Sequence, residues 1–209
     1  MYVRKRNPSI VYWLGNSLYL NITNRCSNSC YFCFRKFKDG IQTFNLKLEK
    51  DPTAEEVMEE LRKIIHRKNW GEVVFCGFGE PMERLNLVLD VTRKVKKQYW
   101  KTVRVDTNGQ GYLLNKGINV VRELASAGVD KVSVSLNAHN EETYNQICKP
   151  MFENAYKSVL QFIINAKIEG LETEATAVTI PEIEIAEVKK LAERLGVKFT
   201  EREYFPFFW

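Results

Sequence analysis

Short, nearly continuous apolar runs alternate along this chain with longer segments of helical periodicity, and no other feature constrains its fold as strongly. Runs without polar alternation are typical of strands buried on both faces, as in a parallel sheet covered by helices. The six runs cover residues 17–23, 72–77, 102–107, 131–136, 173–180 and 197–201. At 209 residues the chain is shorter than a full eight-stranded β/α barrel, which takes about 250 residues. The alternation predicts an α/β fold, which could be an open doubly wound sheet or an incomplete barrel. Of the two, we predict the partial (β/α)6 barrel.

The segments between these runs repeat apolar residues at helical spacing. Thr53 and Glu56 form a capping-box pattern at the start of the first segment, and Asn140 is a favourable N-cap for the fourth. We expect helices over about 53–65, 83–99, 115–127, from 140 onward, 154–166 and 185–195. No linker rich in Gly, Pro or Ser divides the chain, so residues 1–209 are expected to form a single domain.

Composition narrows the class of protein. The chain is 44% hydrophobic, which excludes a disordered protein, and it contains no apolar run long enough to span a membrane. Its basic N-terminus lacks the apolar segment of a signal peptide, so we expect a cytoplasmic protein without a membrane partner. The net charge of +5 is mild, and the basic clusters lie where helices end, so nucleic acid is not the expected partner.

Three of the five cysteines are close together in the sequence. Cys26, Cys30 and Cys33 form a C-x3-C-x2-C triplet directly after the first predicted strand. Three such thiolates can hold three irons of a 4Fe–4S cluster and leave the fourth iron without a protein ligand. A zinc site is the alternative, and its fourth ligand would come from Cys76, Cys148, His66 or His139.

The triplet resembles the cluster motif of the radical S-adenosylmethionine (SAM) superfamily, in which an aromatic residue precedes the last cysteine. Phe32 occupies that position. The resemblance implies an enzyme in which Cys26, Cys30 and Cys33 ligate a 4Fe–4S cluster. The open iron would bind the amino and carboxylate groups of SAM, and reduction would release a 5′-deoxyadenosyl radical that abstracts hydrogen from a substrate.

The same resemblance implies roles for residues at the ends of four further strands. Gly77, Gly79 and Glu80 look like the glycine-rich motif that contacts the methionine amino group, although Phe78 departs from the commoner Gly-Gly-Glu. The other SAM contacts implied are Asp106 and Asn108 near the methionine end, Ser135 and Asn137 at the ribose or carboxylate, and Val178 at the adenine. By strand alternation we also expect Ser133, Ser135 and Asn137 to share the inner face of the barrel.

Within the superfamily, the chain is most similar to small proteins described as TatD-associated radical SAM proteins, whose substrate is not settled. The supporting stretches are residues 19–26, 75–81, 135–138, 143–150 and 202–204. Two enzyme subtypes stay open, an activase of glycyl-radical enzymes and an enzyme like the 7-carboxy-7-deazaguanine synthases. An iron–sulfur electron carrier and a zinc-stabilised binding module are the alternatives of another class.

Two segments have no settled role. In the cluster loop, about residues 24–50, Arg25 adjoins the first cysteine and would either tune the cluster potential or simply be exposed. Arg35, Lys36 and Lys38 follow the cysteines and would face an anionic substrate or an acidic electron donor. A flavodoxin- or ferredoxin-like donor is the partner that the resemblance implies. The aromatic tail, about residues 202–209, is expected to close the open barrel end, with a dimer contact or a substrate-site wall as the alternatives.

Overall fold

A seven-stranded sheet is the frame of the computed structural model, which describes residues 7–204. Its order is β1 (Val11–Leu14), β2 (Ser17–Leu20), β5 (Glu72–Phe75), β6 (Thr102–Thr107), β7 (Lys131–Ser135), β8 (Glu172–Val178) and β9 (Lys198–Arg202). Every neighbouring pair from β2 to β9 is parallel, and β1 is antiparallel to β2. The sheet does not close, because β1 and β9 lie at its two edges. The predicted partial barrel and its six parallel strands are confirmed, and β1 is an edge strand that the sequence did not predict.

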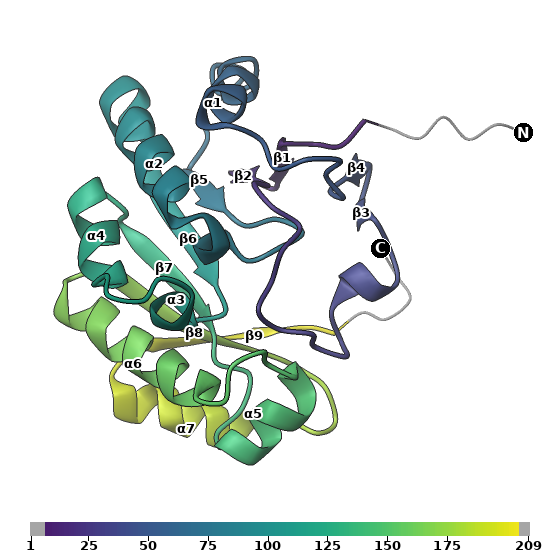
Figure 1. The fold of residues 1–209 in the computed structure, drawn as a ribbon, viewed down its shortest axis with the longest axis vertical. Helices are drawn as coiled ribbons and strands as arrows, with labels where there is room; N and C mark the ends of the chain where they lie inside the picture. Colours follow the sequence, from purple (N-terminus) through teal and green to yellow (C-terminus); the bar gives the residue numbers. More distant parts are fainter. Residues whose placement is uncertain (1–6, 205–209) are drawn as a thin grey trace, which may run out of the picture.

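Helices cover one face of this sheet (Figure 1). They are α1 (Ala54–Arg62), α2 (Leu85–Tyr99), α4 (Val120–Ala127), α6 (Ala155–Ile168) and α7 (Ile185–Leu195), with the shorter α3 (Gly111–Leu114) and α5 (Glu141–Cys148) near the strand ends. Val103, Val105, Val132 and Val134 point toward these helices and are fully or almost fully buried in the main apolar core. Burial of this apolar surface is what holds the layers together.

Two predicted helices begin at different residues in the structure. The helix predicted over 115–127 is wrong in its first turn, because Gly117 has a φ of 80° and Asn119 caps α4 by accepting a hydrogen bond from the Arg122 N–H. The helix predicted from residue 83 is preceded by a 3₁₀ turn, η2 (Pro81–Arg84), and α2 starts after it. The capping box of Thr53 and Glu56 and the Asn140 cap are both present.

The cluster loop runs along the side of the sheet that the helices leave uncovered (Figure 1). It contains the short 3₁₀ helix η1 (Phe34–Lys36) and a small ladder of β3 (Gly40–Ile41) with β4 (Phe44–Asn45). Asn24 holds its two ends together, since its side chain donates to the Leu48 carbonyl and accepts from the Leu48 N–H. The loop is thus tied at its two ends and lies on the side of the sheet opposite the helices.

Two expectations concern the margins of the described chain. Of the aromatic tail, residues 205–209 lie outside the described residues, while the Tyr204 N–H donates to Thr179 Oγ1. Within residues 7–204, no helix is long and apolar enough to cross a membrane.

Candidate active site

The cysteine triplet is held in place by the end of α5. The Ser29 N–H donates to the Cys148 carbonyl and the Tyr31 N–H to the Ile147 carbonyl, at 3.0 and 3.2 Å. A further hydrogen bond joins the Met151 N–H to the Ser27 carbonyl at 2.8 Å. Two residues of the loop that sequence reasoning missed, Ser27 and Ser29, therefore dock the cysteine segment on a distant helix.

All three cysteines are free thiols in half-buried positions. Burial raises the pKa of Cys26 to about 12 and raises the pKa of Cys33. The pKa of Cys30 is raised mainly by its hydrogen bond with Cys148 and, as the second cause, by burial. The thiols are therefore protonated at neutral pH in the protein alone, and binding of iron would displace their protons.

Glu80 is the buried carboxylate of the site. It is 4% exposed and accepts hydrogen bonds from the Met82 N–H, Thr107 Oγ1 and the Asn108 N–H, at 3.0, 2.7 and 2.7 Å. Burial raises its pKa to about 7, against these three donors. An ionised carboxylate offers about four acceptor positions, so one remains for a ligand.

Asn108 connects Glu80 to the cysteine loop. Its backbone N–H binds Glu80, while its side-chain Nδ2 donates to Ser27 Oγ at 2.9 Å and lies 3.9 Å from Cys26 Sγ. Residues 106–109, with the sequence Asp-Thr-Asn-Gly, thus bring the end of β6 to both the thiol and the carboxylate. Thr107, which the sequence reasoning did not single out, contributes to this link through its hydrogen bond to Glu80.

Gly77 and Gly79 pack against residues 21–25, the segment that connects β2 to the first cysteine. A Cβ on Gly77 would collide with Asn21, and one on Gly79 would collide with the backbone oxygens of Thr23 and Arg25. The Glu80 N–H donates to the Arg25 carbonyl at 2.8 Å. Glycine is therefore required here so that the end of β5 can lie beside the cysteine segment.

The expected common face of Ser133, Ser135 and Asn137 is partly wrong. β7 ends at Ser135, so the alternation of a strand does not extend to Asn137. Asn137 has a left-handed φ of 57°, and its Nδ2 donates to Cys148 Sγ at 3.5 Å. Ser135 is half-buried, as is Val178 at the end of β8. Phe32 packs edge-on against Tyr31, with ring centroids 5.6 Å apart.

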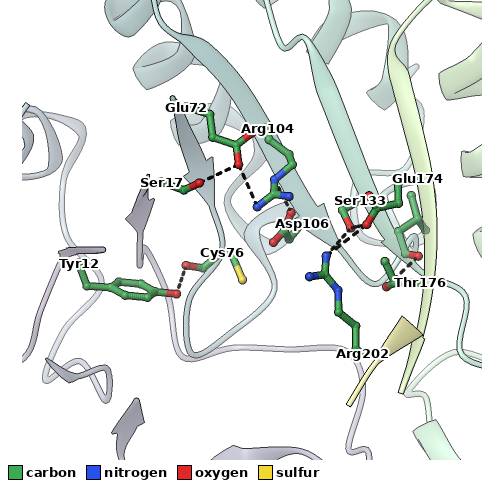
Figure 2. Close-up of polar contacts among 11 residues, drawn as sticks. Tyr12, Ser17, Glu72, Cys76, Arg104, Asp106, Ser133, Glu174, Thr176 and Arg202 are labelled. Carbon is green, nitrogen blue, oxygen red and sulfur yellow. Dashed lines mark hydrogen bonds and ion pairs between the residues drawn. The ribbon is translucent and has the colours of Figure 1, made fainter. Parts of the chain in front are cut away.

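Charged side chains cover the inner face of the sheet, opposite the helices (Figure 2). Arg104 Nη2 lies 3.4 Å from Glu72 Oε1, and its Nε lies 3.2 Å from Asp106 Oδ1. Burial raises the pKa of Asp106 to about 6, although Arg104 opposes this shift. From β9, Arg202 Nη2 reaches Glu174 Oε1 at 3.2 Å and donates to Ser133 Oγ at 3.4 Å. These contacts link β5 to β6 and join β7, β8 and β9, and they were not predicted.

The donor set fits the cofactors that the motif implies. Three free thiols on one loop match three cluster irons, and Glu80 keeps an acceptor position beside them. Among residues 7–204, no three His, Cys, Asp or Glu side chains gather at the spacing of a single metal ion.

Comparison with known proteins identifies the family. The family model described as Radical SAM superfamily matches residues 20–195 of this chain. The chain belongs to the radical SAM superfamily. Members use a 4Fe–4S cluster and SAM, so the predicted family and its cofactors are confirmed at this level.

The similar proteins are longer than this radical SAM chain. A probable GTP 3′,8-cyclase of Methanocaldococcus jannaschii is 25% identical over 190 residues, which cover 91% of this chain and 59% of that protein. The corresponding Thermococcus kodakarensis protein is 32% identical over 131 residues, or 63% and 38% of the two chains. This chain spans about half the length of the curated relatives it matches.

Solved structures share the fold at low identity. SuiB of Streptococcus suis bound to its precursor peptide SuiA has a TM-score of 0.70 and 16% identity, covering 91% of this chain and 39% of that chain. TYW1 with a lysine-pyruvate adduct bound has a TM-score of 0.63 and 18% identity, covering 91% and 65%. These likenesses confirm the partial-barrel fold.

Proposed function

We propose that this chain is a radical SAM enzyme whose cluster ligands are Cys26, Cys30 and Cys33. The bound cluster and SAM would supply a 5′-deoxyadenosyl radical that abstracts hydrogen from the substrate. The observation that carries the proposal is Asn108, which donates to Ser27, lies 3.9 Å from Cys26 Sγ and binds Glu80 through its backbone. The thiol and the carboxylate are thereby held in one site.

Glu80 would bind the ammonium group of SAM through its remaining acceptor position. A bound cation favours the ionised carboxylate, so it would lower the pKa of Glu80 from about 7 and release a proton where the group is still protonated. Gly77 and Gly79 would support this contact by keeping the carboxylate beside the cysteine segment. In the same proposal Asp106, Ser135, Asn137, Val178 and Phe32 line the remainder of the SAM site.

The substrate would meet the inner face of the sheet, where Arg104, Asp106 and Glu174 are half-buried and charged. Such a lining suits a polar substrate rather than a hydrocarbon. GTP is the first compound to test, because the similar proteins are named GTP 3′,8-cyclase. A glycyl-radical activase and an enzyme like the 7-carboxy-7-deazaguanine synthases are the other subtypes. A partner-free turnover assay with small molecules separates the activase from both.

The proposal includes a cytoplasmic location and a flavodoxin- or ferredoxin-like one-electron donor. An electron carrier or a zinc-stabilised module would have no use for an acceptor position on buried Glu80 beside Cys26. Neither alternative accounts for the hydrogen bonds that Thr107 and Asn108 make to Glu80.

The test is anaerobic reconstitution of the cluster, reduction with dithionite and detection of 5′-deoxyadenosine from added SAM. Cys30→Ala should abolish the cluster absorbance. Glu80→Ala should retain the cluster and weaken SAM binding by about tenfold or more. Fully reconstituted protein that neither binds nor cleaves SAM would contradict the proposal, and unchanged affinity in Glu80→Ala would remove the role given to Glu80.

A further inference from the structure

Most of the net charge of the chain is concentrated in the cluster loop. Residues 24–50 contain six Lys and Arg against two Asp and Glu, whereas the whole chain has 31 against 26. The other 182 residues therefore carry 25 basic and 24 acidic side chains, close to neutrality. A loop of 27 residues thus holds four of the five net positive charges.

These charges begin immediately after the last cysteine. η1 starts at Phe34, directly after Cys33, and the Lys36 N–H donates to the Cys33 carbonyl at 3.1 Å. Lys36 is exposed, and its Nζ lies 3.4 Å from the Ser29 carbonyl between Cys26 and Cys30. The basic segment and the thiols therefore share one side of the molecule.

An exposed aromatic ring lies among these cations. Phe37 is 59% exposed and follows Lys36, while the Arg35 guanidinium lies 5.2 Å from the centre of the Phe78 ring. Within residues 7–204, neither Arg35 nor Lys36 forms an ion pair with a carboxylate. In contrast, Lys47 of the same loop pairs with Asp39 at 3.2 Å. Arg35, Lys36, Phe37 and Lys38, which we call the basic patch, thus combine positive charge with an apolar centre.

We propose that the basic patch docks an acidic one-electron donor protein beside the cluster cysteines; this rests on the proposed function. One electron would pass from the reduced donor to the cluster, so that the donor is oxidised by one electron and no proton or group is transferred. Electron transfer slows steeply with distance, and the patch is the surface adjacent to Cys33. Opposite charge speeds the encounter, and redox complexes typically use small interfaces. The positive charge of the patch would also attract RNA, but RNA binding would not explain why the patch begins directly after a cluster ligand.

The experiment compares two charge reversals of equal size. Arg35→Glu with Lys36→Glu alters the patch, while Arg93→Glu with Lys97→Glu alters two exposed residues of α2 on the helical face (Figure 1). The probe is an acidic flavodoxin. Its affinity for each reconstituted protein is measured by calorimetry in about 50 and 300 mM NaCl, and cluster reduction by stopped flow.

The patch reversal should weaken flavodoxin binding by about tenfold or more, and the α2 reversal by less than about twofold. Added salt should weaken wild-type binding and have little effect on the patch variant. Phe37→Ala should weaken binding by about threefold to tenfold through lost apolar contact. Dithionite needs no docking surface, although it is an anion, so in about 300 mM NaCl it should still reduce the cluster of every variant to completion.

Equal flavodoxin affinities in the two reversals would overturn the proposal. So would loss of binding to a short single-stranded RNA in the patch variant while flavodoxin binding stays unchanged, which would assign the patch to RNA. Failure of the proposed function has a different signature, since dithionite would then yield no 5′-deoxyadenosine from the wild-type protein.

Discussion

The two faces of the central strands differ in the chemistry of their side chains and in the partners that the chain supplies to them. On the helical face, the side chains are apolar, and Val105 at the centre of β6 is fully buried. On the inner face, the next residue is Asp106, paired with Arg104. Arg104 Nε and Asp106 Oδ1 are buried atoms that make no hydrogen bond in the described chain, since their 3.2 Å contact has the wrong geometry for one. The helical face of the strands thus makes mainly apolar contacts, although Thr92 Oγ1 of the covering helix α2 is also a buried atom without a hydrogen bond in the described chain. The inner face, in contrast, presents charged groups that keep polar capacity for a ligand.

The largest effect should come from a charge on the helical face. Val105→Asp would bury a carboxylate without a partner, and we expect it to remove about 5 kcal/mol or more of the free energy of unfolding. Urea denaturation measures this loss. Ser135→Asp is the matched control on the inner face, where water and polar neighbours reach the carboxylate and the protein should stay folded. Similar urea midpoints for the two variants would contradict the difference between the faces.

The next effect is a pH dependence that originates on the inner face. Burial raises the pKa of Asp106 from 3.8 to about 6, so the folded protein retains a proton that the unfolded chain has already released. The free energy of unfolding should therefore fall as pH rises from about 4 to 6, by up to about 3 kcal/mol from this group.

Asp106→Asn removes that titration. Its free energy of unfolding relative to wild type should therefore increase across the same pH interval and then become constant. Urea denaturation at four pH values between about 4 and 7 measures the difference, from which the other carboxylates cancel. A difference that does not change with pH would show that Asp106 ionises normally in the folded protein.

The buried strands of these two faces could be predicted from the sequence because their signals are local. The period of burial is local, so runs such as 102–107 and 131–136 predict buried strands, and the structure contains β6 and β7 there. Caps are also local, as Thr53 and Asn140 demonstrate. The start of α4 was predicted wrongly because two equally local signals were overlooked: Gly117 adopts a left-handed φ in open space, and Asn119 is the N-cap.

The site contacts depend on residues far apart in the chain. Arg202 meets Ser133 across 69 positions, and Asn108 meets Ser27 across 81. No local pattern specifies such pairs, and the motif resemblance names residues without giving their partners. Cys148 is the clearest case, because in sequence it is an isolated cysteine, whereas in space it contacts Cys30 and Asn137.

A smaller effect is expected from the ion pair at the open edge of the inner face. Arg202 is 46% exposed and meets Glu174 through one nitrogen, so Arg202→Gln should cost less than about 1 kcal/mol of stability. Urea denaturation beside Lys131→Gln, which removes the pair with Glu172 from the same face, provides the scale. A loss above about 2 kcal/mol would mean that this pair holds the sheet edge together rather than remaining available to a ligand.

The smallest effect on stability is expected for Ser135→Ala, and this substitution gives the clearest distinction between the two faces. Ser135 is half-buried and its hydroxyl makes no hydrogen bond in the described chain, so Ser135→Ala should change stability by less than about 0.5 kcal/mol. If Ser135 binds SAM, as the family motif implies, the same substitution should weaken SAM affinity by about tenfold, measured by equilibrium binding to reconstituted protein.

Ser158 is the matched serine on the helical side, where it is 8% exposed and donates to the Gly109 carbonyl at 3.2 Å. Ser158→Ala should lose about 1 kcal/mol of stability and keep SAM affinity within about twofold. The two substitutions should therefore have opposite effects. Ser158→Ala should lower stability and not SAM affinity, because its hydrogen bond is made within the chain. Ser135→Ala should lower SAM affinity and not stability, because its hydrogen bond is made only with the ligand. Wild-type SAM affinity in Ser135→Ala would place the ligand away from β7 and confine the SAM site to Glu80 and the cysteine loop.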